Sequence, residues 1–434
     1  MTFYSDWGFK SNPFDTAPLT ISAQGSALMV GRDSEIKKIG SRLSNPTKIV
    51  TLEGGNGVGK TSLISVFLYR HIKEICAVNV GPLFIPCERF FQIEKDTSLA
   101  DFKFKVFLEV ASSIMKWKRN IEALRGKKKF QSETALRRFI HSPTTKEISA
   151  GVNVLASGGL SFGSGDSIND GDGFKRNGLE ALVRKWLIEI FPTGEQGGIV
   201  CVIDNLELLQ TSATAREMME VFRDEIFNIH GIRWVLCGAN GIVHGILSST
   251  RLDGRLHKPI LVKELQDRLA DEIYKTRIRS FKDRPDASLP ITQSNFHELY
   301  EILNGNIRSV LSDADEFCNW VADKVDDPDD FEESFFEQWL GEELGALYDG
   351  VSKQLRPRAW EVFDVACELA VFSPGDCLEF GYETPQAMRQ QLRPLEQAGL
   401  IRSDIDDTDK RRKTTSVTSK GWKLRAYLDY YDAE

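Results

Sequence analysis

A glycine-rich stretch that begins at Gly54 and ends at Thr61 limits the fold of this chain more than any other segment. It reads Gly-Gly-Asn-Gly-Val-Gly-Lys-Thr and matches the pattern G-x-x-x-x-G-K-[ST]. A β-branched run, residues 49–52, comes directly before it, and apolar residues at helical spacing follow it from Leu63. A strand, a glycine loop and a helix in this order predict an α/β fold built on a parallel sheet.

Each residue type in this loop suits the binding of a polyphosphate. Glycines allow main-chain N–H groups to turn toward a β-phosphate, the Lys60 ammonium reaches β and γ oxygens, and the Thr61 hydroxyl ligates Mg²⁺. We therefore predict ATP and Mg²⁺ as ligands. The predicted phosphate-binding residues are Gly54, Gly55, Asn56, Gly57, Val58, Gly59, Lys60, Thr61 and Ser62.

A second motif downstream supports the first. The apolar run Ile199–Ile203 has the length of a buried strand and ends in the carboxylate Asp204, which would hold the Mg²⁺ shell through water. Further apolar runs at 83–85 and 234–237 are separated by helical segments. They are typical of a mostly parallel sheet that helices cover on both faces.

The chain is too long for one ordinary core. Its 434 residues, with 41% hydrophobic and 27% charged, predict two or three folded domains rather than a disordered protein. The expected domains are an α/β core at 1–264 with an insertion at about 100–180, a helical lid and acidic connector at 265–349, and a third domain at 350–434.

The insertion and the connector differ in charge. Residues 101–130 carry nine Lys or Arg against three acids, and 323–349 carry eleven acids against one lysine. The first is either a second nucleic-acid contact or a solvated helix face, and the second is expected to be a solvated helical connector. Between them, residues 148–162 alternate apolar and small polar residues around Gly158-Gly159 and predict a hairpin.

Several classes of protein are excluded by composition. No apolar run approaches the roughly 20 residues that cross a bilayer, and the N-terminus lacks the features of a secretory signal, so we expect a cytoplasmic protein with no membrane partner. The seven scattered cysteines are expected to be reduced, and no histidine or cysteine has metal-ligand spacing. With a net charge of −8, any DNA contact requires a local basic surface.

With both motifs in place, the chain resembles the AAA+ ATPases. In that family the residue after the strand-end aspartate is usually a glutamate that activates the attacking water, whereas this chain has Asn205. An amide cannot accept the proton of water. Either Glu207 is the base, or hydrolysis is slow and the protein switches mainly on binding; we favour slow hydrolysis.

The resemblance also implies residues that sense the γ-phosphate. Asn240, at the end of a strand, occupies the position of the sensor-one residue, or it is a turn residue. Arg251 or Arg255 lies in the stretch that carries the arginine finger, which neutralises charge in the site of a neighbouring subunit; the alternative is a surface arginine.

Two further segments are similar to the replication-initiator and STAND branches of the family. Residues 304–308 resemble their sensor-two signature, with Ile307 where proline is usual, so Arg308 would reach the phosphates from the lid. The segment Val30, Gly31 and Arg32 is similar to the one that packs on adenine.

The last eighty residues are similar to the winged-helix domains of bacterial regulators. Thr384-Pro385 starts a helix, and strands are expected at 400–402 and 415–418. If this domain binds DNA, its recognition helix and wing would make the contacts; the alternative is a protein partner. The residues concerned are Arg389, Gln390, Arg393, Lys410, Arg411, Arg412 and Lys413.

Together these features predict an ATP-dependent AAA+ switch that forms a homo-oligomer and engages duplex DNA in replication, transposition or defence against foreign DNA. A separate effector or recruiter protein would act with it. One alternative is a STAND-like signalling component whose winged helix and hairpin bind proteins. Another is a nucleotide-binding subunit with little turnover inside a larger complex, which Asn205 favours.

Overall fold

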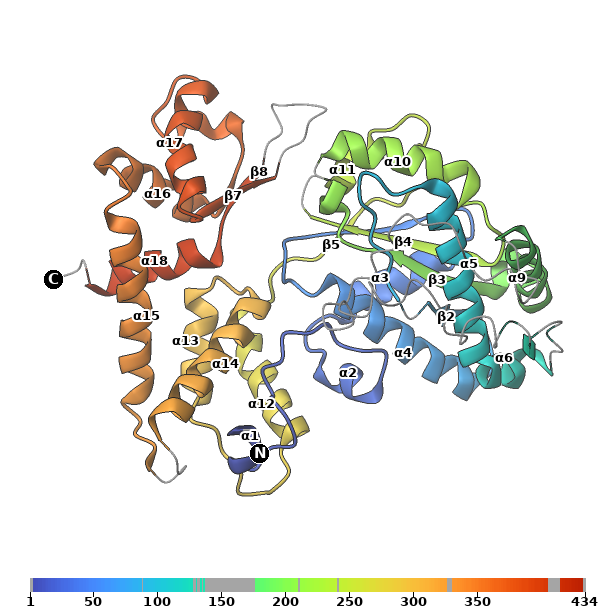
Figure 1. The fold of residues 1–434 in the computed structure, drawn as a ribbon, viewed down its shortest axis with the longest axis horizontal. Helices are drawn as coiled ribbons and strands as arrows, with labels where there is room; N and C mark the ends of the chain where they lie inside the picture. Colours follow the sequence, from blue (N-terminus) through green and yellow to red (C-terminus); the bar gives the residue numbers. More distant parts are fainter. Residues whose placement is uncertain are drawn as a thin grey trace, which may run out of the picture.

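A computed structural model describes residues 3–87, 89–127, 130, 133, 134, 136, 176–209, 211–239, 242–325, 330–404 and 414–431. The chain forms an α/β core, a helical unit next to it, and a C-terminal unit (Figure 1). The predicted hairpin at 148–162 lies outside the described residues.

The core contains a five-stranded parallel sheet with the order β2-β3-β4-β1-β5. Almost every strand residue is buried, because helices cover both faces of the sheet. The predicted α/β fold with a parallel sheet is therefore confirmed. The strands are β1 (Val50–Glu53), β2 (Leu83–Pro86), β3 (Gly197–Ile203), β4 (Ile232–Gly238) and β5 (Ile260–Leu261).

Two hydrophobic clusters lie on the two faces of this sheet. The helices α3 (Asp33–Leu43) and α4 (Lys60–Val78) contribute to the cluster on one face. The other face carries a larger cluster that includes the buried Trp186 and Phe222. Its helices are α5 (Leu99–Lys116), α6 (Lys118–Arg125), α9 (Arg176–Ile190), α10 (Ser212–Glu225) and α11 (Ile242–Leu247).

A helical unit, called the lid below, follows the last strand and has its own core. It consists of α12 (Ala270–Phe281), α13 (Gln293–Ile302), α14 (Ile307–Lys324) and α15 (Phe335–Ser352). The first residues of the chain pack into this core, where the rings of Phe14 and Phe296 stack 6.1 Å apart and the Tyr4 hydroxyl donates to Asp315 at 2.5 Å. The N-terminal segment, with the short helices α1 (Phe3–Asp6) and α2 (Ala23–Leu28), thus joins the lid to the core.

The acidic stretch that we expected to be a solvated connector contains α15, which is packed along one side. Phe336, Trp339 and Leu344 are buried in the lid core, whereas Glu337 and Glu342 are exposed. The alternation of aromatic and acidic residues at helical spacing produces this amphipathic helix. The high number of acidic residues led us to expect a solvated helix, although its apolar residues lie on one face.

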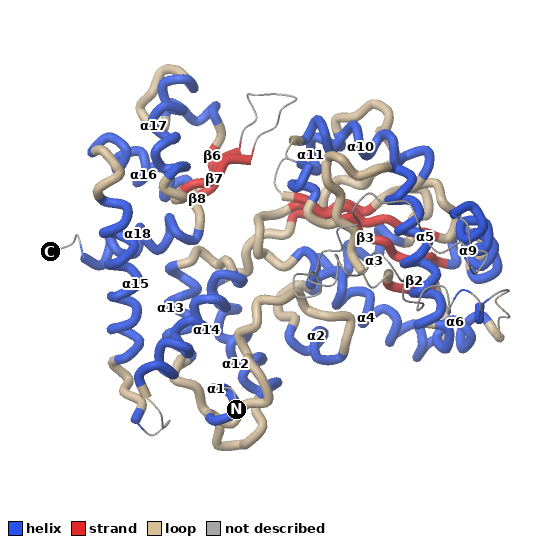
Figure 2. The backbone as a smooth tube through the Cα atoms, viewed as in Figure 1, coloured by secondary structure: helices blue, strands red, loops and turns tan. Residues whose placement is uncertain are grey.

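The C-terminal unit contains the helix that starts at Thr384-Pro385 and the two strands that the sequence predicts, together with a further strand, β6. Its helices are α16 (Pro357–Leu369), α17 (Pro385–Gln397) and α18 (Ser419–Tyr431), and a three-stranded antiparallel sheet has the order β6-β8-β7. The strands are β6 (Val371–Phe372), β7 (Ile401–Asp404) and β8 (Thr414–Val417). The helix α17 starts where predicted, and Thr384 caps it by accepting from the N–H of Ala387 at 3.3 Å. Figure 2 shows the small sheet beside α17.

All seven cysteines are free thiols, and every one except Cys76 is buried. Among the described residues, no helix is long and apolar enough to cross a membrane. Nor do the described His, Cys, Asp and Glu residues form a group of three or more that could hold a metal ion.

Candidate nucleotide-binding site

The glycine loop connects β1 to α4 at the edge of the sheet where the parallel strands end. Gly57 and Gly59 have φ angles of +86° and +92°, a left-handed conformation that a side chain would strain. Gly59 is also the N-cap of the 19-residue helix α4. The N–H groups at the start of a long helix attract anions, since its dipole leaves positive charge there.

Lys60 places its ammonium group inside this loop. Its Nζ donates to the carbonyls of Gly54 and Gly55 at 2.9 and 3.0 Å, and the residue is only 7% exposed. A buried ammonium is costly unless its protons are satisfied. Phosphate oxygens bound in the loop would accept the same protons, with the added attraction of opposite charge.

Thr61 and Asp204 face each other across the end of the sheet, as the two motifs predict. The Thr61 hydroxyl donates to Asp204 Oδ2 at 2.6 Å, and Asp204 is 5% exposed. One hydroxyl and one carboxylate form an oxygen-only donor set, which is the set that Mg²⁺ prefers when phosphates and water complete its shell. These residues therefore fit the expected metal ion, which would neutralise phosphate charge when bound.

Asn205 and Glu207 occupy different positions after β3. Asn205 has φ of +56° and lines the cavity, whereas Glu207 lies one turn further on, in the short helix η4 (Leu206–Leu209). Glu207 Oε2 accepts from the N–H of Ala239 at 3.1 Å. With the Asn56 amide assigned so that its oxygen faces the Arg402 guanidinium, Glu207 Oε1 accepts from the Asn56 nitrogen at 3.0 Å. Glu207 is thus within hydrogen-bond reach of the glycine loop. Asn240, the candidate sensor-one residue, lies outside the described residues.

A cavity opens between the glycine loop, the lid and the N-terminal segment. Its walls include residues 56–62 of the loop and apolar side chains such as Leu28, Val30 and Ile307. Four cationic side chains also line it: Arg32, Lys60, Arg277 and Arg308. A cavity that combines apolar walls with clustered positive charge matches a base and its polyphosphate.

Arg308 lies against the glycine loop, where the resemblance expects a lid arginine. It is the second residue of α14, whose N-cap Asn306 donates from Nδ2 to the carbonyl of Asn56 at 3.0 Å. A Cβ on Gly57 would lie 2.6 Å from Asn306 Oδ1 and 3.0 Å from Arg308 Cβ. The lid and the loop are therefore in direct contact.

The segment expected to pack on adenine is only partly directed at the cavity. Val30 and Arg32 line it, but the Arg32 guanidinium donates to the carbonyls of Val58 and Lys263 at 3.0 and 2.7 Å. It also forms an ion pair with Glu35 at 3.1 Å. These contacts connect the glycine loop, the end of the sheet and α3, so Arg32 holds the walls of the cavity together.

Arg277 is a cavity residue that the sequence analysis missed. It is 7% exposed, and its Nη1 donates to the carbonyls of Pro13 and Asp15 at 2.7 and 3.3 Å. Burial lowers the pKa of Arg277 to about 10. Nearby, the N–H of Leu19 donates to Ser62 Oγ at 3.0 Å. No motif marks these contacts, because they join segments more than 40 residues apart.

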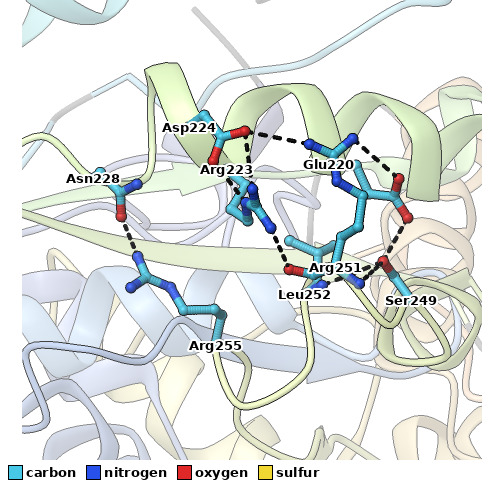
Figure 3. A network of polar contacts seen from close by, with 8 residues as sticks. All are labelled: Glu220, Arg223, Asp224, Asn228, Ser249, Arg251, Leu252 and Arg255. Atoms are coloured by element: carbon cyan, nitrogen blue, oxygen red, sulfur yellow. Dashed lines mark hydrogen bonds and ion pairs between the residues drawn. The ribbon is translucent and has the colours of Figure 1, made fainter.

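Arg251 belongs to a surface network at α10 (Figure 3). Its guanidinium lies 3.8 Å from Glu220 and 3.4 Å from Asp224, and the Ser249 hydroxyl donates to Glu220 at 2.5 Å. The Arg251 side chain is 52% exposed, and it is absent from the walls of this chain's cavity. Two carboxylates thus hold an arginine at a surface that a second molecule can approach.

Arg255 lies beside the same network. Its guanidinium donates to the side chain of Asn228, while Arg223 donates to Asp224 at 2.7 Å and to the Arg251 carbonyl at 3.0 Å (Figure 3). The hydrogen bond from Arg223 holds the pKa of Asp224 below its usual value. Like Arg251, Arg255 is not among the residues that line the cavity.

Of the seven residues predicted to contact DNA, three lie in the part of the chain that the structure describes. Arg389, Gln390 and Arg393 are exposed on α17, whereas Lys410, Arg411, Arg412 and Lys413 lie outside the described residues.

The basic stretch at 101–130 includes most of α5 and all of α6, and two of its cations have carboxylate partners. Lys103 pairs with Glu180 and Glu225 at 3.1 Å each, and Lys118 pairs with Glu133 at 2.7 Å. These two cations are therefore held by ion pairs within the core, and a second nucleic-acid contact by this stretch stays a prediction.

No family model and no curated protein matches this chain. Among solved structures, the chain is similar to the Walker-type ATPase PABY2304 of Pyrococcus abyssi, with 15% identity over 95% of this chain and 99% of that one and a TM-score of 0.48. It is also similar to the Aeropyrum pernix ORC1 protein in complex with DNA, with 12% identity, 98% of each chain covered and a TM-score of 0.45. A third similar structure is Cdc6p from Pyrobaculum aerophilum, with 13% identity over 97% of this chain and 100% of that one and a TM-score of 0.40.

The fold and the site contain the parts that the sequence predicts for a P-loop nucleotide site. They are a glycine loop between a central parallel strand and a helix, a strand-end aspartate beside the loop threonine, and a helical lid with an arginine on the loop.

Proposed function

We propose that this protein is an ATP-binding molecular switch of the AAA+ type. The observation that carries the proposal is the convergence of Lys60, the Thr61–Asp204 pair and the lid residue Arg308 at the glycine loop. Phosphate bound there would contact both the core and the lid, so it would bias the angle between them. Calorimetric titration of the purified protein with ATP and magnesium tests this, and absence of heat would contradict it.

Hydrolysis, in this proposal, is slow and uses Glu207. Asn205 cannot accept a proton, and Glu207 contacts the loop through Asn56. Lys60 and Arg308 would hold the phosphates. Glu207 would orient the attacking water molecule and accept its proton at Oε1.

We expect Glu207→Gln to lower phosphate release by about 100-fold or more, since a positioned general base contributes that much. ATP affinity should change little. Phosphate release is measured at saturating ATP, with Glu217→Gln, an exposed change on α10, as the matched control. Equal rates in wild type and Glu207→Gln would remove Glu207 as the base and favour a switch with little turnover.

ATP would also drive self-association. Arg251 or Arg255, presented at the surface, would approach the γ-phosphate of a neighbouring copy and neutralise charge there. Mass measurement with and without ATP reports the oligomer directly. A single mass in both conditions would contradict an ATP-driven assembly.

The C-terminal unit is proposed to be a winged helix that binds duplex DNA through α17. Replacing Arg389 and Arg393 by alanine is expected to weaken duplex binding and to lower the slope of log affinity against log salt by about 1 to 2, because each lost phosphate contact removes about 0.9. Arg358→Ala, an exposed change on α16, is the control. Unchanged affinity and slope would exclude α17 as the contact. The wing residues 410–413 would be tested in the same way.

A signalling role without DNA is the second candidate, and one contact favours it. Arg402 of the C-terminal unit reaches the glycine loop, as expected of a unit that reads the nucleotide rather than DNA. A duplex-binding assay with and without ATP separates the two roles. For the DNA-binding role, the proposed settings are replication, transposition or defence against foreign DNA. In each of them a separate effector protein would act with this one.

A further inference from the structure

Asn56, in the glycine loop, contacts all three parts of the molecule. Its carbonyl accepts from Asn306 Nδ2 of the lid at 3.0 Å. Its side-chain amide is assigned by the partners it faces: with the nitrogen toward Glu207, it donates to Oε1 at 3.0 Å, and its oxygen accepts from Arg402 Nη1 of the C-terminal unit at 2.7 Å. One amide therefore links the candidate base to a strand nearly 200 residues further along the chain.

The Arg402 contact orients this amide. Its oxygen must face a donor and its nitrogen an acceptor, and Arg402 supplies donors only. With the oxygen held by the guanidinium, the nitrogen points to Glu207. A charged donor makes this a stronger bond than one between neutral groups, although both Asn56 and Arg402 are exposed.

Glu207 consequently has one hydrogen-bond donor at each oxygen. Oε2 accepts from the N–H of Ala239 and Oε1 from Asn56. The main-chain bond is fixed by the position of β4, whereas the Asn56 bond depends on a side-chain rotamer. The Asn56 bond takes one of the two acceptor positions of Oε1 and fixes its direction, so opening this bond frees that position for the proton of a water molecule.

The C-terminal unit is fastened to the lid by α18. Lys423 forms an ion pair with Asp313 of α14 at 2.7 Å, with their side chains 21% and 11% exposed. The Ser309 and Ser419 hydroxyls lie 2.6 Å apart, and the Tyr430 hydroxyl donates to Glu298 of α13 at 3.2 Å. Ser309 directly follows Arg308, so a shift of α14 toward a phosphate carries the C-terminal unit with it.

We propose that the C-terminal unit restrains the candidate catalytic base through the chain of contacts Arg402–Asn56–Glu207, and that a movement of the lid breaks it. Arg402 is a positioning residue in this scheme, since it acts on Glu207 through Asn56. The inference rests on the proposed ATPase function and adds the regulation of that site.

The first experiment measures phosphate release by Arg402→Ala. We expect kcat to rise about threefold to tenfold, as loss of one restraining hydrogen bond predicts, with KM nearly unchanged. Arg402→Lys keeps a donor and should stay close to wild type. Arg358→Ala removes the same charge from the same unit and should match wild type. Combining Arg402→Ala with Glu207→Gln should abolish the rise.

The second experiment measures the distance between fluorescent unnatural amino acids at the exposed positions Glu379, in the C-terminal unit, and Glu217, on α10. Without nucleotide, Arg402→Ala should move the distance distribution toward that of wild type with ATP. If Arg402→Ala matches Arg358→Ala in both kcat and distance, the restraint does not exist. If wild type fails to bind ATP, the proposed function fails, and the nucleotide-free distances still decide whether Arg402 holds the unit in place.

Discussion

Replacement of Lys60 by alanine is expected to abolish ATP binding. The ammonium now donates to two carbonyls inside the glycine loop, and phosphate oxygens would take over its protons. Each hydrogen bond to a charged group contributes about 1.5–3 kcal/mol. Loss of two such bonds and of the positive charge should lower the affinity at least about 100-fold.

Calorimetry with ATP and magnesium measures this effect. Lys73→Ala is the matched control, because Lys73 lies on the same helix but is exposed. The circular dichroism spectrum should be the same for wild type and both variants. Retention of wild-type affinity by Lys60→Ala would show that the glycine loop does not hold the phosphates, and with it the proposed switch would fail.

The sheet was predictable because its signals are local. The runs at 49–52, 83–85, 199–203 and 234–237 are all buried strands, and burial on both faces produces the continuous apolar runs that identify them. The loop was predictable for a related reason: the left-handed φ angles at Gly57 and Gly59 strongly favour glycine. Both features are encoded in short stretches of sequence.

The contacts that close the site were not predictable in this way. Arg277 anchors residues 13–15, and Arg402 reaches Asn56. In each contact, an arginine donates to an acceptor far away in the sequence: main-chain carbonyls for Arg277 and a side-chain amide for Arg402. Neither the arginine nor its acceptor belongs to a periodic sequence pattern. Only the assembled fold brings them together. The buried face of α15 is a different case, because Phe336, Trp339 and Leu344 lie at helical spacing and the sequence therefore contains its signal.

Replacement of Arg32 by alanine is expected to destabilise the protein by about 2–4 kcal/mol, within the range for breaking a buried hydrogen-bond network. Arg32 is 5% exposed, and its removal leaves the carbonyls of Val58 and Lys263 without this donor and Glu35 without this cation. Urea denaturation followed by tryptophan fluorescence measures the change. Lys37→Ala, an exposed change on α3, should alter the midpoint little.

This variant also separates two roles for the segment at residues 30–32. The resemblance assigns the segment to the adenine ring, whereas the hydrogen bonds of Arg32 give it a role in holding the cavity walls. If Arg32 mainly holds the cavity walls together, Arg32→Met should destabilise the protein about as much as Arg32→Ala does. Neither methionine nor alanine can donate a hydrogen bond to the two carbonyls. If these Arg32 variants instead keep wild-type stability but bind ATP weakly, the main role of Arg32 is to contact the nucleotide.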